Sequence, residues 1–512
     1  MRNLLSLALA LTAIVPASAR AEGARYLIIT TSSYAPYLEP LAEWKTRKGM
    51  PARIVTTQET GYSTQQIQDY VQQAVETWDP APEYVLIAAD QNTIAMAVED
   101  GYNTDTTFGN LDDDLFVEVV PGRFPATSAT EIQTMVAKTL QYERTPIVDD
   151  PFYFRSAALL IYEDHDDDDI CSYFGDANWA AGLMEQAGFT DVNIWSYATT
   201  SNIYDRFEGL LNDGVGWAAH HGVVGSNCEW PAYGVDPEGL HNGPMLPIMV
   251  GYTCQTLGYS GYNCFGERWL QAGTPANPLG GVAYVGQAAS CSYCAHWRSA
   301  LRRGFWGYIF EDRGPTDIVA FGDAVEAGRL RYYEEFRSSS QYYVSTAMGD
   351  PELNIWTDVP QAFEISHPPI VPRGEIEFSV LVSQGGVPRE GVLVCAMSDE
   401  GSYAYEYSDD DGLVSFSIDT SQDVELYLTA TGRNLYPYEG NIQVYEVGAP
   451  VDTGDPPLDD TSDPDIPDDT DRPPVGIAPG GTCGCVSPAV PAAPLALLLL
   501  PLWLRRRREG RA

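Results

Sequence analysis

The chain has 512 residues, 44% of them hydrophobic and 11% aromatic, which is the composition of a globular protein. This length exceeds what one hydrophobic core usually fills, so we expect two or three folded units with flexible connections. The formal net charge of −42 would repel polyanions and excludes nucleic acid as a partner.

The N-terminus has the features of a secretory signal peptide. Arg2 is followed by an apolar run at 4–15 and by Ala19-Arg20-Ala21, after which we place the cleavage site. The run is shorter than the about 20 residues that a membrane-spanning helix needs. We therefore predict that residues 1–21 are a signal peptide and that the protein is secreted.

Residues 22–148 predict alternating strands and helices. Apolar runs at 26–31, 52–55 and 84–89 predict strands, and the stretches 38–48 and 67–77 predict helices. This order is typical of βαβ units and a largely parallel sheet. Strands that are apolar on both faces need helices on both faces of that sheet.

A second α/β unit is predicted for residues 149–358. It has expected strands at 157–162, 192–195, 216–219, 246–252 and 281–286, and an expected helix at 179–188. The last three strands each lead directly into residues with reactive side chains. Because sites in open α/β sheets lie beyond the carboxyl ends of strands, we expect the functional site there.

The pattern changes at residue 359. Short alternating strands at 376–380, 392–395, 413–418 and 424–430 predict a small β-sandwich over 359–447. Residues 448–480 are rich in Asp, Pro and Thr and predict an extended, self-repelling linker.

The C-terminal tail, 481–512, carries Cys483 and Cys485, an apolar segment that ends at Leu504, and four arginines at 505–508. Such a basic cluster stays on the cytoplasmic side, so the tail predicts contact with a membrane before or after processing. It also resembles C-terminal sorting tails of myxobacterial type, which implies processing near the two cysteines and retention at the cell surface or outer membrane. An ordinary single-span anchor is the alternative, although four prolines interrupt the apolar segment.

His220-His221-Gly222 follows one predicted strand, and Cys254 follows the next. A thiol becomes a good nucleophile when an imidazole can take its proton, so these residues predict a catalytic pair. Two adjacent histidines on an extended segment point to opposite sides, so only one can face Cys254. A metal-ligating histidine and a disulfide-bonded cysteine are the alternatives.

Several ordered motifs across 22–446 resemble the gingipain family of cysteine peptidases. They are Trp44-Lys45 with Lys48-Gly49 and Val55-Thr56-Thr57, then 80–86, 121–125, Leu246-Pro247 through to Cys254, Cys264-Phe265-Gly266-Glu267, and 348–353. The resemblance implies a caspase-like catalytic unit of two α/β subdomains, 22–148 and 149–358, followed by an immunoglobulin-like β-sandwich.

The resemblance also implies roles for single residues. Cys254 matches the nucleophile, and His221 matches the histidine of the family's Gly-His-Gly motif, although His220 replaces the first glycine. We favour His221 because Gly222 follows it, and the backbone N–H groups of Gly222 and Cys254 would then form the oxyanion hole. Glu163 approximately matches the acidic partner of the catalytic histidine, with Asp164 as the near alternative and a solvated loop acid as the other reading.

Specificity is predicted from the acidic run Asp166, Asp167, Asp168 and Asp169. The family's arginine-directed members hold the P1 side chain with an acid in this loop, so we expect cleavage after Arg or Lys. A structural calcium ion on these aspartates and an inert charged loop are the alternatives, while the chemistry itself needs no cofactor. Trp297 resembles the pocket-lining tryptophan and could stack on the P1 side chain, with core packing as the alternative.

Six cysteines remain once Cys254 and the tail pair are set aside. In an exported protein we expect disulfides among them, and they are Cys171, Cys228, Cys264, Cys291, Cys294 and Cys395. A zinc site around Cys291, Cys294 and His296 is a minor alternative, since no second ligand pair has suitable spacing.

The sequence therefore predicts a secreted cysteine endopeptidase that acts on proteins or peptides. Two other hypotheses remain: a catalytically impaired surface adhesin or binding protein with the same fold, and a transpeptidase that acts on sorting signals. An intact thiol and imidazole at adjacent strand ends favour the endopeptidase.

Overall fold

The structure, a computed structural model, describes residues 21–446 except 113, 148, 163–172, 223–233, 258–262 and 290–294. The predicted linker and C-terminal tail, and the predicted signal peptide before Ala21, lie outside the described residues. Within the described ranges, no helix has the length and apolar character needed to cross a membrane.

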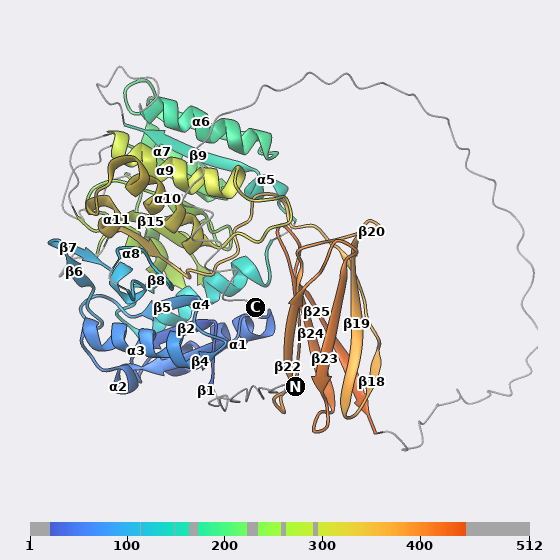
Figure 1. Cartoon of the computed structure of the whole chain (residues 1–512). Coiled ribbons are helices and arrows are strands. Elements are labelled where there is room, and N and C mark those ends of the chain that lie inside the picture. Colours follow the sequence, from blue (N-terminus) through green and yellow to red (C-terminus); the bar gives the residue numbers. More distant parts are fainter. Residues whose placement is uncertain are drawn as a thin grey trace, which may run out of the picture. The chain divides into compact units, whose positions relative to one another are not determined.

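A sheet forms the centre of the α/β part (Figure 1). It has ten strands in the order β10-β9-β11-β12-β15-β16-β8-β5-β2-β3. Neighbouring strands are parallel except β15 and β16, which are antiparallel. As a result, β9 to β12 and β15 end at one edge of the sheet, and the other strands end at the opposite edge. The bounds are β2 (Tyr26–Thr30), β3 (Ala52–Thr56), β5 (Tyr84–Ala88), β8 (Val120–Phe124), β9 (Ser156–Ile161), β10 (Asp191–Ser196), β11 (Trp217–His221), β12 (Ile248–Val250), β15 (Ala283–Gln287) and β16 (Ser345–Met348).

The eight apolar runs predicted as strands in this part are confirmed, and the sheet is largely parallel as expected. Most of them are buried along their whole length, which explains why continuous apolar runs identified them. The sequence did not predict β8, because Pro121 and Gly122 are poor strand formers. The structure buries Arg123 by pairing it with both carboxylate oxygens of Asp105, at 2.6 and 2.7 Å.

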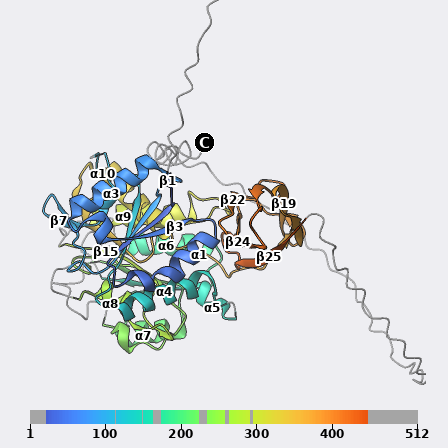
Figure 2. The same cartoon turned by 90° about the horizontal axis from the view of Figure 1, so that it is seen from below.

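Helices cover both faces of the sheet, with α3 and α10 on one side and α1, α4 and α8 on the other (Figure 2). The predicted helices are confirmed as α1, α3 and α6, whereas α4, α9 and α10 were not predicted. The bounds are α1 (Glu39–Arg47), α3 (Thr64–Thr77), α4 (Ala129–Glu143), α6 (Tyr173–Gln186), α7 (Ile203–Asp213), α8 (Phe265–Gln271), α9 (Ala295–Phe310) and α10 (Phe321–Phe336). Helices α9 and α10 pack closely at Gly304, where a Cβ atom would lie 2.5 Å from the carbonyl oxygen of Ala327.

Shorter elements connect the main ones. They are α2 (Thr57–Thr60), α5 (Pro151–Phe154), α11 (Ser340–Val344), the 3-10 turns η1 (Ala35–Tyr37), η2 (Thr106–Phe108) and η3 (Pro237–Gly239), and the strand pairs β1 (Ala21–Glu22) with β4 (Trp78–Asp79), β6 (Ala97–Glu99) with β7 (Tyr102–Thr104), and β13 (Gly273–Thr274) with β14 (Asn277–Pro278).

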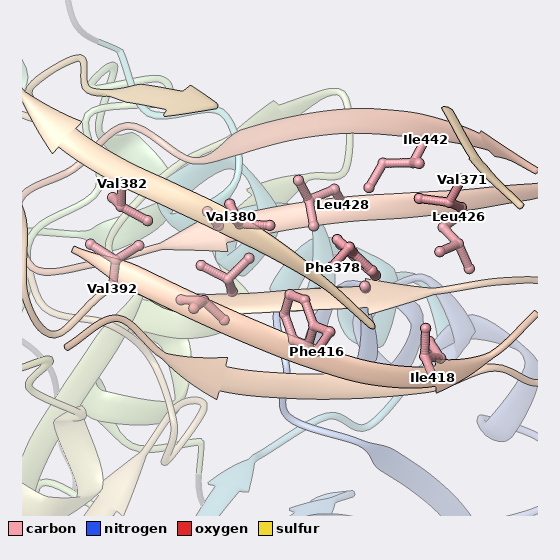
Figure 3. Packing of buried hydrophobic residues seen from close by; sticks show 14 of the residues in the cluster. Val371, Phe378, Val380, Val382, Val392, Phe416, Ile418, Leu426, Leu428 and Ile442 are labelled. Carbon is pink, nitrogen blue, oxygen red and sulfur yellow. The ribbon is translucent and has the colours of Figure 1, made fainter. Parts of the chain in front are cut away.

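Two further sheets follow the α/β part and enclose a common apolar core. One contains β17 (Glu364–Ser366), β19 (Glu375–Gln384), β20 (Val387–Pro388) and β23 (Leu413–Asp419), and the other contains β18 (Ile370–Pro372), β25 (Tyr438–Tyr445), β24 (Glu425–Thr431), β21 (Leu393–Met397) and β22 (Tyr403–Tyr407). Alternate residues of β19 and β23 are buried, as a half-exposed strand requires. Phe378 and Phe416 from one sheet pack with Leu428 from the other (Figure 3). The four strands predicted here are confirmed.

Cys395 corrects one prediction about the cysteines. Cys264 is disulfide-bonded, but Cys395 is free and fully buried in β21. Its Sγ lies 3.7 Å from the carbonyl oxygen of Thr46 in α1, and burial raises the pKa of the thiol to about 12. Cys395 therefore behaves as a small apolar residue, and the other four candidates for disulfides lie outside the described residues.

A buried ionic cluster ties α1 to α4 and to the loop after β16. Lys45 Nζ lies 2.5 Å from Asp350, 2.6 Å from Glu352 and 3.0 Å from Glu143. Lys48 Nζ adds contacts of 2.6 Å to Glu352 and 3.1 Å to Glu143. All five side chains are almost fully buried, so each charge depends on the others for its solvation.

Candidate active site

His221 and Cys254 lie beyond the carboxyl ends of two adjacent strands. β11 and β12 are parallel neighbours with Ala219 opposite Val250, and His221 is the last residue of β11. Cys254 follows β12 by four residues. Because parallel neighbours end at the same edge, the fold brings both residues to one edge of the sheet, where the sequence placed the functional site.

The two histidines face opposite sides of the sheet. The Trp217 ring packs against Phe305 and Trp306 of α9, with ring centroids 6.2 and 5.0 Å away. Side chains alternate along a strand, so His221 also faces α9. His220 faces the other side, where its ring centroid is 6.0 Å from that of Tyr197.

The Cys254 side chain also lies toward α9. The thiol is half-buried and is not disulfide-bonded. Its Sγ accepts a hydrogen bond from Arg298 Nη2 of α9 at 3.2 Å. His221 and Cys254 therefore both lie toward α9, whereas the His220 ring packs against Tyr197, although the charge of Arg298 also acts on His220.

Both histidines are completely buried. Burial first, and the charge of Arg302 second, hold the pKa of His220 and of His221 well below the usual value of 6.5. Neither ring nitrogen of His221 has a hydrogen-bond partner among the described residues. The His221 imidazole is thus neutral near pH 7 and can accept a proton.

The backbone around Cys254 is fixed and locally strained. Gln255, the next residue, has φ of 53°, which non-glycine residues rarely adopt. Its N–H donates to the Ala289 carbonyl oxygen at 3.2 Å, and the Thr256 N–H donates to that of Gln287 at 3.1 Å. These bonds hold the turn that carries Cys254 against the end of β15, as strained backbone at functional sites is held by its surroundings.

Gly222 is required by the backbone next to His221. Its φ is 135°, and a Cβ atom would lie 2.6 Å from the Cβ of Tyr162 and 2.8 Å from its carbonyl oxygen. The Tyr162 N–H donates to the His221 carbonyl oxygen at 2.8 Å, so the backbone segments at Tyr162 and Gly222 cannot move apart without loss of this hydrogen bond.

We expect Gly222→Ala to lower kcat/KM for peptide hydrolysis by about 100-fold, because the clash displaces His221. It should also destabilise the fold by about 1–3 kcal/mol, measured by thermal unfolding. Gly182→Ala in α6 is the matched control, since a Cβ atom there meets nothing within 4 Å. Equal kinetics for the two variants would contradict the structural role of Gly222.

A layer of charged residues between α6 and α9 supports the site, and sequence reasoning missed it. Arg302 Nη2 donates to the carbonyl oxygens of His220 at 3.5 Å and Tyr252 at 3.4 Å, so it bridges the ends of β11 and β12. Asp176 of α6 accepts from Ser299 at 2.7 Å and lies 3.5 Å from Arg302. The spacing of Arg298 and Arg302, four residues apart on one face of a helix, is the signal that could have indicated this layer.

The model of Peptidase family C25 matches residues 19–356, which is more than half of the chain. The chain belongs to Peptidase family C25. This membership agrees with the predicted resemblance to gingipains and with the thiol and imidazole at adjacent strand ends.

Named relatives of this C25 chain are gingipains of Porphyromonas gingivalis. Gingipain R2 is 25% identical over 435 residues, which cover 81% of this chain and 56% of the relative. Lys-gingipain is 22% identical over 418 residues, which cover 72% of this chain and 23% of the relative. The chain thus spans about half the length of gingipain R2, and less of Lys-gingipain.

Two solved structures share the fold of this C25 chain. The crystal structure of the Arg-specific cysteine proteinase gingipain R has a TM-score of 0.74 at 20% identity and covers 83% of this chain and 98% of that one. The complex of the pro- and mature domains of the same Porphyromonas gingivalis proteinase also gives 0.74, at 21% identity, and covers 82% and 100%. The mixed α/β fold predicted from the sequence is confirmed by these likenesses.

Other predicted site residues of this C25 chain are less well placed. Glu163 and the run Asp166, Asp167, Asp168 and Asp169 lie outside the described residues, so their roles stay predictions. Trp297 is half-buried, and its ring packs against Tyr332 and Phe336 of α10, with centroids 6.1 and 6.3 Å away. This ring holds α9 to α10, and its contact with a P1 side chain also stays a prediction.

Two groups of carboxylates in the described residues have the geometry for a metal ion. Asp112, Asp114 and Glu118 form a largely exposed group. The buried group is that of Glu143, Asp350 and Glu352, where Lys45 and Lys48 supply the positive charge instead.

Proposed function

We propose that this chain is a cysteine endopeptidase with Cys254 as the nucleophile and His221 as the catalytic base. The observation that carries the proposal is that an unoxidised, half-buried thiol and a neutral imidazole share one face of the sheet beyond adjacent strand ends. That arrangement suits thiol activation by proton transfer to the ring. Membership of Peptidase family C25 supports the reaction class.

Three groups would complete the catalytic machinery. The backbone N–H groups of Gly222 and Cys254 would stabilise the oxyanion, and the positive φ of Gly222 supports a close approach of backbone to substrate. Glu163 follows β9, the strand next to β11, and would orient and stabilise the protonated His221 ring.

The substrates in this proposal are proteins or peptides with Arg or Lys at P1. The acidic run at 166–169, with Trp297, would recognise the basic side chain, and carboxylates suit a guanidinium because they pair with it in bidentate geometry. Relatives named for arginine and lysine support this preference. A structural calcium ion bound by the same acidic run is the competing proposal.

We also propose that the enzyme is secreted and retained at the cell surface or outer membrane. The signal peptide at 1–21 and the sorting tail at 481–512 support this location. The two sheets of residues 364–445 would form an immunoglobulin-like domain, and the α/β part a caspase-like one.

The test is iodoacetamide labelling of the folded protein, combined with profiling of a peptide library. We expect Cys254 to be the fastest cysteine to react near neutral pH, and cleavage after Arg or Lys to disappear in proportion to its labelling. Cys395 is the internal control, because its buried thiol should stay unlabelled. Unmodified Cys254 under these conditions would favour the adhesin hypothesis, and cleavage without preference for Arg or Lys would remove the proposed P1 role of the acidic run.

A further inference from the structure

Arg298 donates a hydrogen bond to the Cys254 sulfur. It comes from the first turns of α9 and is 1% exposed. Nη2 donates to Sγ at 3.2 Å, and Nη1 donates to the Tyr173 hydroxyl of α6 at 3.0 Å. An arginine side chain stays protonated in proteins, so this contact places a permanent positive charge against the thiol.

The position of this guanidinium is set by packing. Helices α6 and α9 are held together by Asp176, which accepts from Ser299 at 2.7 Å and from Arg303 at 2.9 Å. The Tyr173 hydroxyl, on the same helix as Asp176, accepts from Nη1 and so orients the Arg298 guanidinium with Nη2 toward the sulfur. A fixed cation of this kind needs no reorganisation when negative charge develops beside it.

We propose that Arg298 is a catalytic residue that stabilises the thiolate of Cys254. The inference rests on the proposed function, because it assigns a role in the reaction of that same thiol. An opposite charge within about 4–6 Å typically lowers a pKa by 1–3 units, and cysteine acidity responds in this way to a neighbouring Arg or Lys.

The charged and titratable groups around the site show why such a cation matters. From β11 they are His220 and His221, from α6 Tyr173 and Asp176, and from α9 Arg302 beside Arg298. Burial and the Arg302 charge hold the pKa of His221 well below 6.5, so its protonated ring is a weak partner for a thiolate. Arg298 offsets this weakness, because it stabilises the sulfur anion without needing a proton.

The proton and bonding changes balance with this role. The Cys254 proton passes to His221 while Arg298 stabilises the resulting thiolate. The sulfur attacks the peptide carbonyl carbon, the C–N bond breaks, and the His221 proton goes to the departing amine. Water then gives a proton to His221 and its hydroxyl to the carbonyl carbon, the C–S bond breaks, and the thiolate returns to the Arg298 contact.

The test is the pH dependence of iodoacetamide alkylation at Cys254, read by peptide mass spectrometry. In Arg298→Met we expect the midpoint to rise by about 1–3 pH units and the rate at pH 6 to fall about 10-fold or more. Arg298→Lys should lie closer to the native protein, since it keeps a charge. Arg331→Met is the control, and its midpoint should not move because Arg331 pairs with Glu335 on the exposed side of α10 and takes no part in this packing.

An unchanged alkylation midpoint in folded Arg298→Met would overturn the proposal. If the P1 preference changes while the midpoint does not, Arg298 is a substrate-binding residue instead. If Arg298→Met does not fold, Tyr173→Phe decides, because it removes the hydroxyl that positions the guanidinium and should raise the midpoint.

The same data separate this proposal from the proposed function. A raised midpoint in a protein whose native form cleaves no peptide would leave Arg298 as a thiolate-stabilising residue and remove the endopeptidase function. An unchanged midpoint in Arg298→Met, in a protein whose native form does cleave peptides, would remove the proposed role of Arg298 and leave the endopeptidase function in place.

Discussion

Cys254→Ala should reduce kcat/KM for peptide hydrolysis by about 10⁴-fold or more while the protein stays folded. The thiol of Cys254 is not disulfide-bonded and follows β12, the strand next to the one that ends in His221, so its removal takes away the proposed nucleophile. Loss of the nucleophile in a catalytic unit typically costs this much, with residual activity from the remaining binding groups. The measurement is a kinetic assay on a peptide substrate with Arg or Lys at P1, and circular dichroism checks that the variant is folded.

The two histidines supply the control for this prediction. His221→Ala should lose activity to a similar extent, because nucleophile and base act as a unit. His220→Ala should keep most of the activity, because His220 lies on the other face of β11 against Tyr197. If His220→Ala is the inactive variant and His221→Ala is active, the assignment of the catalytic base is wrong.

The strands that position this site were predictable, because parallel strands covered on both faces must be apolar throughout. β9, β11 and β12 meet that condition. β16 does not, since Ser345 and Thr346 are polar, and β8 contains a proline and a glycine. Both segments form strands because their place in the fold overrides their weak strand propensity, and a local sequence pattern does not show such tertiary contacts.

The proposed catalytic pair and its surroundings differ in how far the sequence predicts them. His221 and Cys254 were predictable from their position directly after predicted strands, and Gly222 from its place beside the histidine. Arg298 was not, because a charged residue within a helix normally indicates a solvated face. Its burial depends on Tyr173 and Cys254, which lie 125 and 44 positions away in the chain.

The buried ionic cluster gives the largest expected effect on stability. Lys45→Met removes the ammonium group that contacts Asp350, Glu352 and Glu143, and leaves three buried carboxylates with Lys48 alone. Removal of one partner from a buried ion pair typically costs about 3–5 kcal/mol, because the remaining charge is not compensated. We expect this loss in the free energy of unfolding, measured by urea denaturation at pH 7.

The control is Arg331→Met, which breaks an exposed pair with Glu335 at 2.9 Å on α10. Such pairs contribute about 0–1 kcal/mol, so the free energy of unfolding of this variant should be close to that of the native protein. A loss of less than 1 kcal/mol in Lys45→Met would mean that the three carboxylates are solvated or protonated in the folded protein.

The pH dependence separates lost charge compensation from lost packing in Lys45→Met. Burial would raise the pKa of Glu143, but Lys45 and Lys48 lower it to about 2 in the native protein, whereas burial holds the pKa of Glu352 above its usual value. A carboxylate with a lowered pKa contributes stability above its unfolded value, and this contribution is lost as the pH falls toward 2. Without Lys45, burial raises the carboxylate pKa values, so the folded variant binds protons more readily than its unfolded chain and gains stability on acidification. The difference in the free energy of unfolding between the native protein and Lys45→Met should therefore be smaller at pH 4.5 than at pH 7. A packing defect would give the same difference at both pH values.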